Sequence, residues 1–410
     1  MKIFVKNSHI ILAFIYFALL VLSSPIKDDS NKALKSSQEE EEEVTLSAIE
    51  NFDNEEIIED SGVEILSDIE EVSQVAISND DLIKIEIMKE IEVTNKIQEI
   101  DNGFRFSKIE GNYGLDEFIK RNGTTSVMDL IEFLKENQLI SESANITLED
   151  PGFACSSFLV HKKDEDGFYF GRNFDYSNSK ATVLLTYPEN DYSSIFTVNL
   201  SFIKDNNNSL TEEDLKYLSV YAPVDGVNEK GLTVSANMVG FIYVDNDTPK
   251  PDIITSVAIR LLLDKAATVE EAINILKEYD MHQSLGLYTH FAITDAEGNA
   301  VVVEYINNEM TYVHSPINEN FFLTPGDYYG NSIYIYSEDN IEILPLSQRR
   351  YAIIKERLEK YPIITREQVR DTLSASSQSV TAWSVVYDKD NKEAYYYFNL
   401  DYEHGYHVKL

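Results

Sequence analysis

The chain contains a single cysteine, Cys155, among its 410 residues. A lone cysteine cannot form an intramolecular disulfide, so the fold must be held together by its core. With 43% hydrophobic residues, the chain can bury the core of one large or two ordinary domains. A free cysteine is either a small buried hydrophobic residue or, in a chain with histidines and carboxylates, a candidate nucleophile. The residues around Cys155 favour the second interpretation.

These neighbouring residues predict a β-hairpin. The stretch 155–161 has the small and β-branched residues of a strand, a turn with Asp166-Gly167 follows, and 168–172 is the returning strand. Because a hairpin brings the end of its second strand beside the start of its first, we expect Arg172 and Asp175 near Cys155. A guanidinium near a thiol favours the thiolate, and a carboxylate can position an amine or imidazole. A surface Arg–Asp pair beside a hairpin is the alternative.

Four segments carry a recognisable order of motifs. They are Cys155-Ser-Ser-Phe with Gly171-Arg-Asn-Phe-Asp-Tyr, Asp225-Gly-Val-Asn-Glu-Lys-Gly-Leu, the helical stretch 259–272, and Thr381-Ala-Trp-Ser-Val-Val-Tyr. In this order they resemble the choloylglycine hydrolase and acid amidase group, linear amide carbon–nitrogen hydrolases of the N-terminal-nucleophile type. The resemblance implies an α+β fold, a four-layer αββα sandwich of two antiparallel sheets. Runs of strands, then helices, then strands along the chain agree with it.

The resemblance also implies roles for individual residues. Cys155 would be the nucleophile, and its own α-amino group, freed by cleavage of the Ala154–Cys155 bond, would be the base. Asp175 would orient that amine, and Arg172 would favour the thiolate and contact the substrate. Asn237, late in a strand, would donate its amide N–H to the oxyanion. The family's late arginine corresponds to Arg350, with Arg349 as the alternative. No cofactor or metal is implied.

One departure from the family pattern stands against activity. The family usually has Thr-Asn where this chain has Thr324-Pro325, and proline offers neither an amide side chain nor a backbone N–H. Asn331 is the nearest candidate for a replacement. The departure motivates an alternative hypothesis, a catalytically weak or inactive scaffold that acts as a secreted interaction protein. An acyltransferase of the same family is a further alternative, and so is a cysteine hydrolase with His161 or His290 as its base.

The substrate is expected to be a small molecule with a linear amide, of the bile-salt-conjugate, N-acyl amine or N-acyl amino acid type. Many aromatic and few basic residues favour an uncharged or apolar acyl group. The formal net charge of −37 argues against nucleic acid and anionic membrane surfaces as partners, because both would repel the chain. The sequence does not indicate an oligomeric state.

The N-terminal part is expected to be a leader. Residues 1–24 have the basic start and short apolar run of a secretory signal peptide, and no later stretch is long and apolar enough to cross a bilayer. We therefore expect a secreted protein, or one in the lumen of the secretory or lysosomal pathway. Asn-X-Ser/Thr glycosylation triplets agree with that route; they begin at Asn122, Asn145, Asn199, Asn207 and Asn246.

Three segments follow the signal peptide. Residues 25–100 are rich in Glu, Asp, Ser and Ile and predict a disordered or loosely helical acidic leader. Residues 101–154 show helical spacing of apolar residues at 115–120 and 125–137, with Thr125 or Ser126 as an N-cap. They predict a helical pre-segment that packs on the catalytic domain, 155–410.

Overall fold

The residues around Cys155 form the predicted hairpin in the computed structural model of the protein. β5 (Ala154–Lys162) and β6 (Phe168–Asp175) pair antiparallel, with Ala154 opposite Asp175 and Ser157 opposite Arg172. The structure describes residues 86–410 except 102, 149–152, 164, 178, 240–243, 245, 285–287 and 331–345. The predicted signal peptide and most of the predicted acidic leader lie outside the described residues. So does Asn331.

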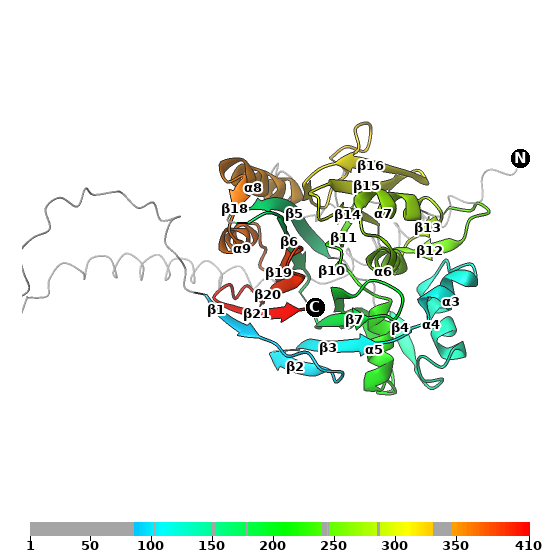
Figure 1. The fold of residues 1–410 in the computed structure, drawn as a ribbon. Coiled ribbons are helices and arrows are strands. Elements are labelled where there is room, and N and C mark those ends of the chain that lie inside the picture. Colours follow the sequence, from blue (N-terminus) through cyan, green and yellow to red (C-terminus); the bar gives the residue numbers. More distant parts are fainter. Residues whose placement is uncertain are drawn as a thin grey trace, which may run out of the picture. The chain divides into compact units, whose positions relative to one another are not determined.

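Two large sheets contain most of the strands (Figure 1). The first runs in the order β1-β21-β20-β19-β6-β5-β17, and β18 also pairs with β5. Besides the hairpin, its strands are β1 (Ile87–Glu90), β17 (Ile317–Asn318), β18 (Ile363–Ile364), β19 (Thr381–Asp388), β20 (Glu393–Phe398) and β21 (His404–Lys409).

The second sheet runs in the order β16-β15-β14-β11-β10-β8-β7-β3-β2. Its strands are β2 (Gln98–Asp101), β3 (Phe104–Glu110), β7 (Ala181–Tyr187), β8 (Ser194–Asn199), β10 (Asp225–Asn228), β11 (Thr233–Met238), β14 (Thr289–Thr294), β15 (Ala300–Ile306) and β16 (Glu309–His314). Two small sheets pair β4 (Ile146–Leu148) with β9 (Ile203–Asp205) and β12 (Asp252–Ile254) with β13 (Asp280–His282).

Helices cover the outer face of each sheet. α6 (Thr255–Lys265) and α7 (Val269–Leu276) contact the nine-stranded sheet, while α8 (Leu346–Lys360) and α9 (Arg366–Ala375) contact the eight-stranded one. The predicted αββα sandwich is therefore confirmed. Three pairs within these sheets are parallel rather than antiparallel: β1 with β21, β3 with β7 and β18 with β5.

The remaining helices contribute apolar side chains to the cluster that α6 also joins. They are α3 (Leu115–Lys120), α4 (Val127–Glu136), the short 3-10 helix η2 (Leu200–Phe202) and α5 (Glu212–Val220). Ser126 caps α4 as predicted, because its side chain accepts a hydrogen bond from the backbone N–H of Asp129. No helix in the described ranges has the length and apolar composition needed to span a bilayer.

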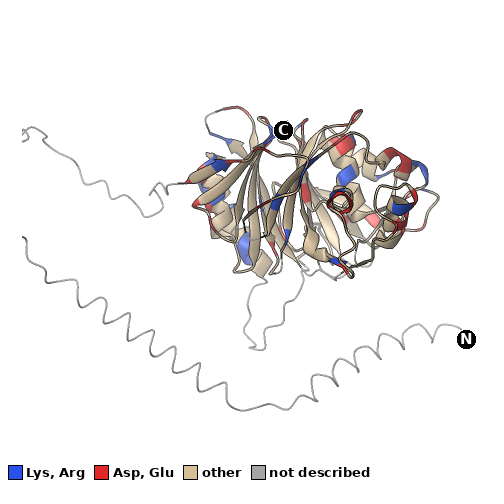
Figure 2. Cartoon of the chain, turned by 90° about the horizontal axis from the view of Figure 1, so that it is seen from below, with Lys and Arg blue, Asp and Glu red and all other residues tan. Residues whose placement is uncertain are grey.

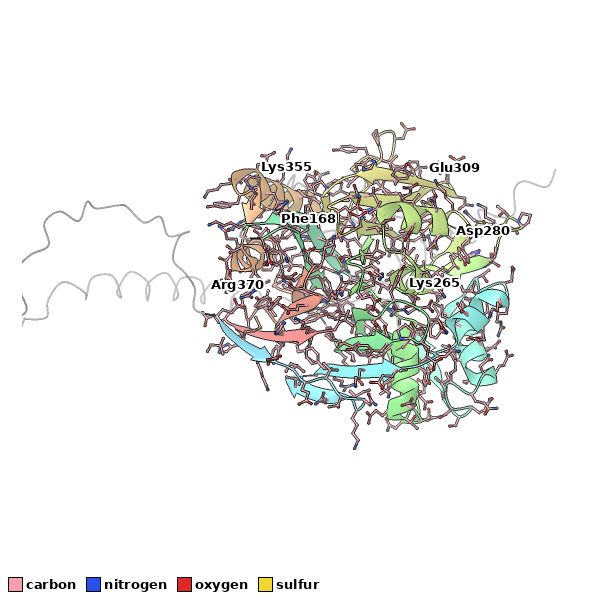
Figure 3. The ribbon with its side chains drawn as sticks, in the orientation of Figure 1. Phe168, Lys265, Asp280, Glu309, Lys355 and Arg370 are labelled. Carbon is pink, nitrogen blue, oxygen red and sulfur yellow. The ribbon has the colours of Figure 1, made fainter. Side chains whose placement is uncertain are left out.

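The chain before Cys155 contains more strand than the sequence predicts. The stretch 101–154, predicted to be helical, also contains β3 and β4, and β1 and β2 lie in or at the edge of the predicted leader. Glu86, at the start of the described chain, forms ion pairs with Arg366 at 2.8 Å and Arg370 at 2.9 Å. Arg370 projects from α9, where Figure 3 labels it. Residues 86–154 thus contribute strands to both large sheets.

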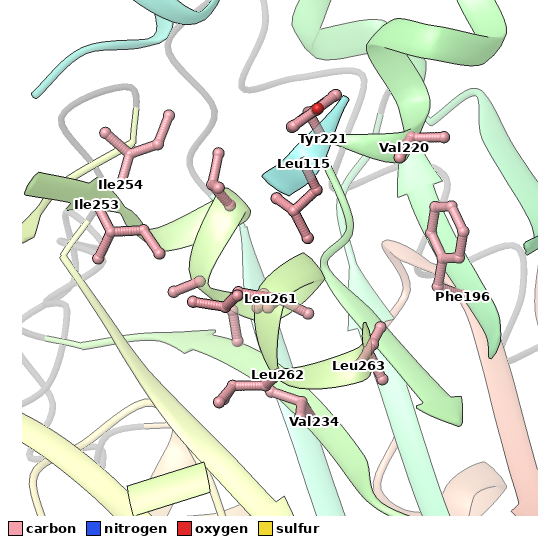
Figure 4. Packing of buried hydrophobic residues seen from close by; sticks show 14 of the residues in the cluster. Leu115, Phe196, Val220, Tyr221, Val234, Ile253, Ile254, Leu261, Leu262 and Leu263 are labelled. Atoms are coloured by element: carbon pink, nitrogen blue, oxygen red, sulfur yellow. The ribbon is translucent and has the colours of Figure 1, made fainter. Parts of the chain in front are cut away.

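Two apolar clusters position the site. Between the sheets, Cys155 packs in a cluster with Phe174 and Trp383, whose rings stack at 3.9 Å. A second cluster joins the outer face of the nine-stranded sheet to α6 and the pre-segment; Figure 4 shows Leu115 and Tyr221 beside Leu261 in it. Figure 2 shows Lys, Arg, Asp and Glu interspersed over the described chain, while the strands are mostly uncharged. The first of these clusters thus surrounds Cys155, while the second lies on the other face of the nine-stranded sheet.

Candidate active site

Cys155 lies at the start of β5 and is fully buried. Its Sγ accepts a hydrogen bond of 3.2 Å from Nη2 of Arg172. Burial raises the pKa of the Cys155 thiol to about 12, although the positive charge of Arg172 acts in the opposite direction. In the uncleaved chain the thiol is therefore protonated at neutral pH, even with a guanidinium beside it.

Arg172 connects the two sheets at this point. From β6 it donates through Nη1 to Asn237 Oδ1 at 2.7 Å and through Nη2 to the carbonyl of Ala236 at 2.8 Å. Its Nε lies 2.7 Å from Oδ2 of Asp225, and both side chains are fully buried. A buried ion pair of this kind is stable only when its remaining polar atoms are also satisfied. The network therefore fixes the guanidinium against the Cys155 sulfur.

Asn237 is oriented by the same arginine. Because its Oδ1 accepts from Arg172, its Nδ2 points the other way, 3.4 Å from the carbonyl oxygen of Cys155 and 3.3 Å from that of Asn318. Asn237 therefore presents an amide N–H donor next to Cys155. Such a donor, held in place before the reaction, is what a developing oxyanion requires.

Asp175 lies close to Cys155 but does not contact its nitrogen. It stands opposite Ala154 in the ladder, and its carboxylate accepts from Thr381 Oγ1 at 2.5 Å and from Gln378 Nε2 at 2.6 Å. Burial raises the pKa of Asp175, and the charge of Arg350 counteracts this. The carboxylate is thus held rigidly beside the Ala154–Cys155 bond.

Asn320, which the sequence analysis did not single out, binds the nitrogen of Cys155. Its Oδ1 accepts from the Cys155 N–H at 2.9 Å and from Arg350 Nη2 at 2.7 Å, and its Nδ2 donates to the Met238 carbonyl at 2.7 Å. Thr324 lies elsewhere, with its backbone N–H on Glu304 at 2.8 Å. The side-chain amide that seemed lost at Pro325 is therefore supplied five residues earlier. The second asparagine of Asn318-Glu-Asn320 was the available signal.

Arg350, rather than Arg349, is the arginine of the site. Arg349 is exposed, whereas Arg350 is buried and donates through Nε to Ser156 Oγ at 3.0 Å. Its Nη2 lies 2.6 Å from Oε2 of Glu319 and 3.4 Å from the carbonyl of Cys155. Glu319 is completely buried, and this burial raises the pKa of its carboxyl group to about 7 despite the neighbouring Arg350.

The histidines do not contact Cys155 through any hydrogen bond among the described residues. His161 lies at the other end of β5, roughly 20 Å along the strand. His290 is buried, with Nδ1 3.1 Å from Glu304 and Nε2 2.8 Å from the carbonyl of Glu319. His161 Nδ1 lies 2.9 Å from the carbonyl of Lys162, so both rings have other partners and the geometry does not favour a histidine base.

An apolar pocket adjoins this cluster at the same end of the nine-stranded sheet. It has an empty volume of about 840 Å³ including its open mouth. Leu130, Ile131 and Leu134 of α4 form one wall, and Phe153 and Ala236 line the pocket too. Phe153 precedes Cys155 by two residues, and the Ala236 carbonyl is bound by Arg172. The pocket therefore reaches the immediate neighbours of the nucleophile.

These features together define a class of protein. The site holds a thiol at the start of a central strand, a guanidinium on its sulfur and amide groups around it. These groups lie between two sheets covered by helices. They are the parts of an N-terminal-nucleophile cysteine hydrolase. Among the described residues, no three His, Cys, Asp or Glu side chains gather in a metal-binding group.

Comparison with known proteins finds a family match over part of the chain. Residues 155–320 match the family described as linear amide C-N hydrolases, choloylglycine hydrolase family. The match covers less than half of the chain, and it agrees with the family that the motifs predict. No curated protein sequence matches the chain.

Two solved structures illustrate the likeness. One is a mutant conjugated bile acid hydrolase from Clostridium perfringens, with 15% identity over 62% of this chain and 92% of that chain, and a TM-score of 0.46. The other is penicillin V acylase from Agrobacterium tumefaciens, with 16% identity over 62% of this chain and 86% of that chain, and a TM-score of 0.41.

Proposed function

We propose that the chain is a cysteine amidase that cleaves its own Ala154–Cys155 bond and then hydrolyses small-molecule amides with an apolar acyl group. One observation carries this proposal. Arg172 holds the sulfur of Cys155 at 3.2 Å while Asn320 holds its nitrogen at 2.9 Å. The two atoms that must exchange an acyl group are therefore fixed by separate partners in one buried site.

The cleavage is an N-to-S acyl shift followed by hydrolysis. The Cys155 thiol attacks the Ala154 carbonyl carbon, the C–N bond breaks, and the thiol proton passes to the departing nitrogen. The product is a thioester between Ala154 and Cys155, with a free α-amine on Cys155. Water then cleaves the thioester, which releases the Ala154 carboxylate and restores the thiol. Fixed geometry favours such a step, because it makes the attack intramolecular.

The new α-amine then serves as the general base. An α-amino group has a pKa of about 8, so it can accept the Cys155 proton near neutral pH. The thiolate attacks the substrate carbonyl and forms an acyl thioester. The amine of the substrate leaves and takes the proton from the α-amino group of Cys155. Water then hydrolyses the thioester. Asn237 donates to the oxyanion, and Arg172 stabilises the thiolate. Asn320, the partner of this nitrogen before cleavage, positions the amine, with the Asp175 carboxylate beside it.

The apolar pocket supports the choice of acyl group. Its walls are mostly aliphatic and aromatic side chains, and its lining reaches Phe153 and Ala236 next to the catalytic cluster. Burial of each methylene group there is worth about 0.8 kcal/mol. An extended or ring-containing hydrocarbon acyl group suits this pocket, and a charged one does not.

The hypothesis of an inactive scaffold loses its main support. It rests on the missing asparagine at Pro325, and Asn320 now stands beside Cys155. Secretion is a separate part of the proposal and rests on residues 1–24. Sequencing the N-terminus of the protein from culture medium tests it. Of the five glycosylation triplets, Asn122, Asn145 and Asn207 have exposed side chains, whereas Asn199 is buried.

The experiment that tests the proposal combines mass spectrometry with a hydrolysis screen. The wild-type chain should yield a fragment that begins at Cys155 and should hydrolyse N-acyl amides, N-acyl amino acids or bile-salt conjugates. Cys155→Ala should do neither, while His161→Ala should do both. An active protein without a chain beginning at Cys155 would refute the processing step. Activity that survives Cys155→Ala would refute the proposed nucleophile.

A further inference from the structure

The apolar pocket contains a hydrogen-bond donor that no protein group uses. We infer that the pocket takes an acyl group that carries an oxygen remote from the amide, and that this oxygen accepts a hydrogen bond from Nδ2 of Asn199. The inference rests on the proposed function, since it specifies the acyl group of the same substrate. It makes Asn199 a residue that determines specificity.

The orientation of the Asn199 side chain is fixed by its oxygen. Oδ1 accepts from the backbone N–H of Lys180 at 2.9 Å, from the backbone N–H of Ser201 at 3.2 Å and from Ser201 Oγ at 2.9 Å. Two of these donors are main-chain groups that can only donate, so the atom facing them must be the oxygen. The amide nitrogen therefore faces away from this turn.

Asn199 lines the pocket, and its Nδ2 is buried without a partner. The residue is only 3% exposed, so bulk water does not satisfy the two N–H groups. Buried polar groups are rarely left unpaired, because the loss of their hydration is costly. A donor kept in such a place is readily explained if a ligand supplies the acceptor.

The other polar side chains of the pocket differ in this respect. Thr255, Ser256 and Ser284 hydrogen-bond among themselves, and the Tyr221 hydroxyl donates to the Tyr113 carbonyl at 2.8 Å. Among the described lining residues, the unpartnered side-chain atoms are Asn199 Nδ2 and Thr289 Oγ1. Thr289 pairs with Met238 in the ladder and so lies on the catalytic side of the pocket.

Strand order gives the position of the expected oxygen. Asn199 ends β8, and β8 is separated from β11, the strand of Asn237, by β10 alone. Two strand spacings correspond to roughly 10 Å. An acyl chain with its carbonyl at Asn237 would therefore cross the apolar floor of the pocket and place a ketone, ether or hydroxyl oxygen several carbons away at Asn199.

Binding to the wild-type protein as purified, with its accessible Cys155 thiol blocked by methyl methanethiosulfonate, tests this inference independently of hydrolysis. The ligands are N-methyl amides of a medium-length fatty acid and of its oxo analogues, with the ketone moved carbon by carbon along the chain. Isothermal titration calorimetry gives their dissociation constants. One ketone position should bind roughly ten- to a hundredfold more tightly than the plain chain, because an unpaired buried donor penalises the ligand that lacks the acceptor.

The variant Asn199→Asp, with its thiol blocked in the same way, separates the donor from the turn. It keeps an oxygen for the three turn hydrogen bonds and replaces the two N–H groups by an acceptor, so the preference for the ketone should disappear. Asn207→Asp, on the exposed surface, makes the same chemical change and should leave that preference intact.

Equal binding of plain and oxo ligands would overturn the inference, because ordered water would then satisfy Asn199. A ketone preference that survives Asn199→Asp would also overturn it. If that variant fails to fold, the ligand series on the parent chain still decides. Binding with the expected preference, but no amide hydrolysis by the wild-type enzyme, would refute the proposed function and leave this inference standing.

Discussion

The buried carboxyl group of Glu319 gives a quantitative prediction about stability. Glu319 is completely buried, and its Oε2 lies 2.6 Å from Nη2 of Arg350. Burial raises its pKa from 4.5 to about 7, and the attraction of Arg350 offsets only part of this effect. The variant Glu319→Gln keeps the shape of the side chain but removes the titrating proton.

The direction of this pKa shift decides how the stability of the protein changes with pH. The folded protein holds the Glu319 proton more tightly than the unfolded chain, so the contribution of Glu319 to stability is fully present below the unfolded pKa of about 4.5. It is lost as pH rises through the folded pKa of about 7. Each pKa unit corresponds to about 1.4 kcal/mol, so the full loss is on the order of 3 kcal/mol. Glu319→Gln cannot show this loss.

Urea denaturation of both proteins across this pH range measures the effect. The unfolding free energy of wild type minus that of Glu319→Gln should fall by about 3 kcal/mol between pH 4.5 and about pH 7, and be flat on either side. Groups that do not interact with Glu319 titrate alike in both proteins and cancel in the difference. The reasoning would be refuted by a difference that does not change with pH, or by one that rises.

Three further predictions concern the same framework. Arg172→Met should lower the unfolding free energy by about 3–5 kcal/mol in urea titrations, because Asp225 remains buried without its partner. Adding Asp225→Asn to this variant should recover part of the lost stability. Full stability of the single variant would contradict the buried pair. Deletion of residues 2–85 should leave the melting temperature and the extent of processing unchanged. Deletion of residues 2–100 should lower both, since it removes Glu86, β1 and most of β2. Equal cleavage of the two deletion variants on a gel and equal melting temperatures would contradict this. After cleavage the fragment that ends at Ala154 should elute with the rest of the protein in size-exclusion chromatography, because β1 and β3 belong to different sheets; separate elution would contradict it.

Local signals explain what could be predicted from the sequence. The hairpin around Cys155 follows from strand residues on both sides of Asp166-Gly167, and it alone brings Arg172 and Asp175 to the nucleophile. Ser126 marks the start of α4 by its side-chain cap. Gly231 has the positive φ, 79°, that its turn requires. Each of these features depends on residues that are close together in the chain.

The features that could not be predicted depend on distant pairing. β1 pairs with β21 from the opposite end of the chain, and short strands such as these carry little pattern of their own. Asn320 and Glu319 reach Cys155 because β17 pairs with β5, a register that no local motif indicates. The stretch 217–221 ends helix α5, and the capping box of Thr211 with Asp214 is the local signal for that helix.

The burial of Cys155 explains why hydrolysis should depend on the cleavage. In the uncleaved chain Ala154 continues β5, and the ring of Phe153 stacks on that of Phe174 at 5.1 Å, so the chain itself occupies the approach to the thiol. Desolvation is the largest contribution to the raised pKa of Cys155. Release of residues 153 and 154 would admit water and substrate, while the ion pair with Asp225 would keep Arg172 beside the sulfur. The pKa of the thiol should then fall, because the effect that raises it weakens while the charge that lowers it stays. The same step creates the amine that accepts the proton, so a single bond cleavage provides both the nucleophile and its base.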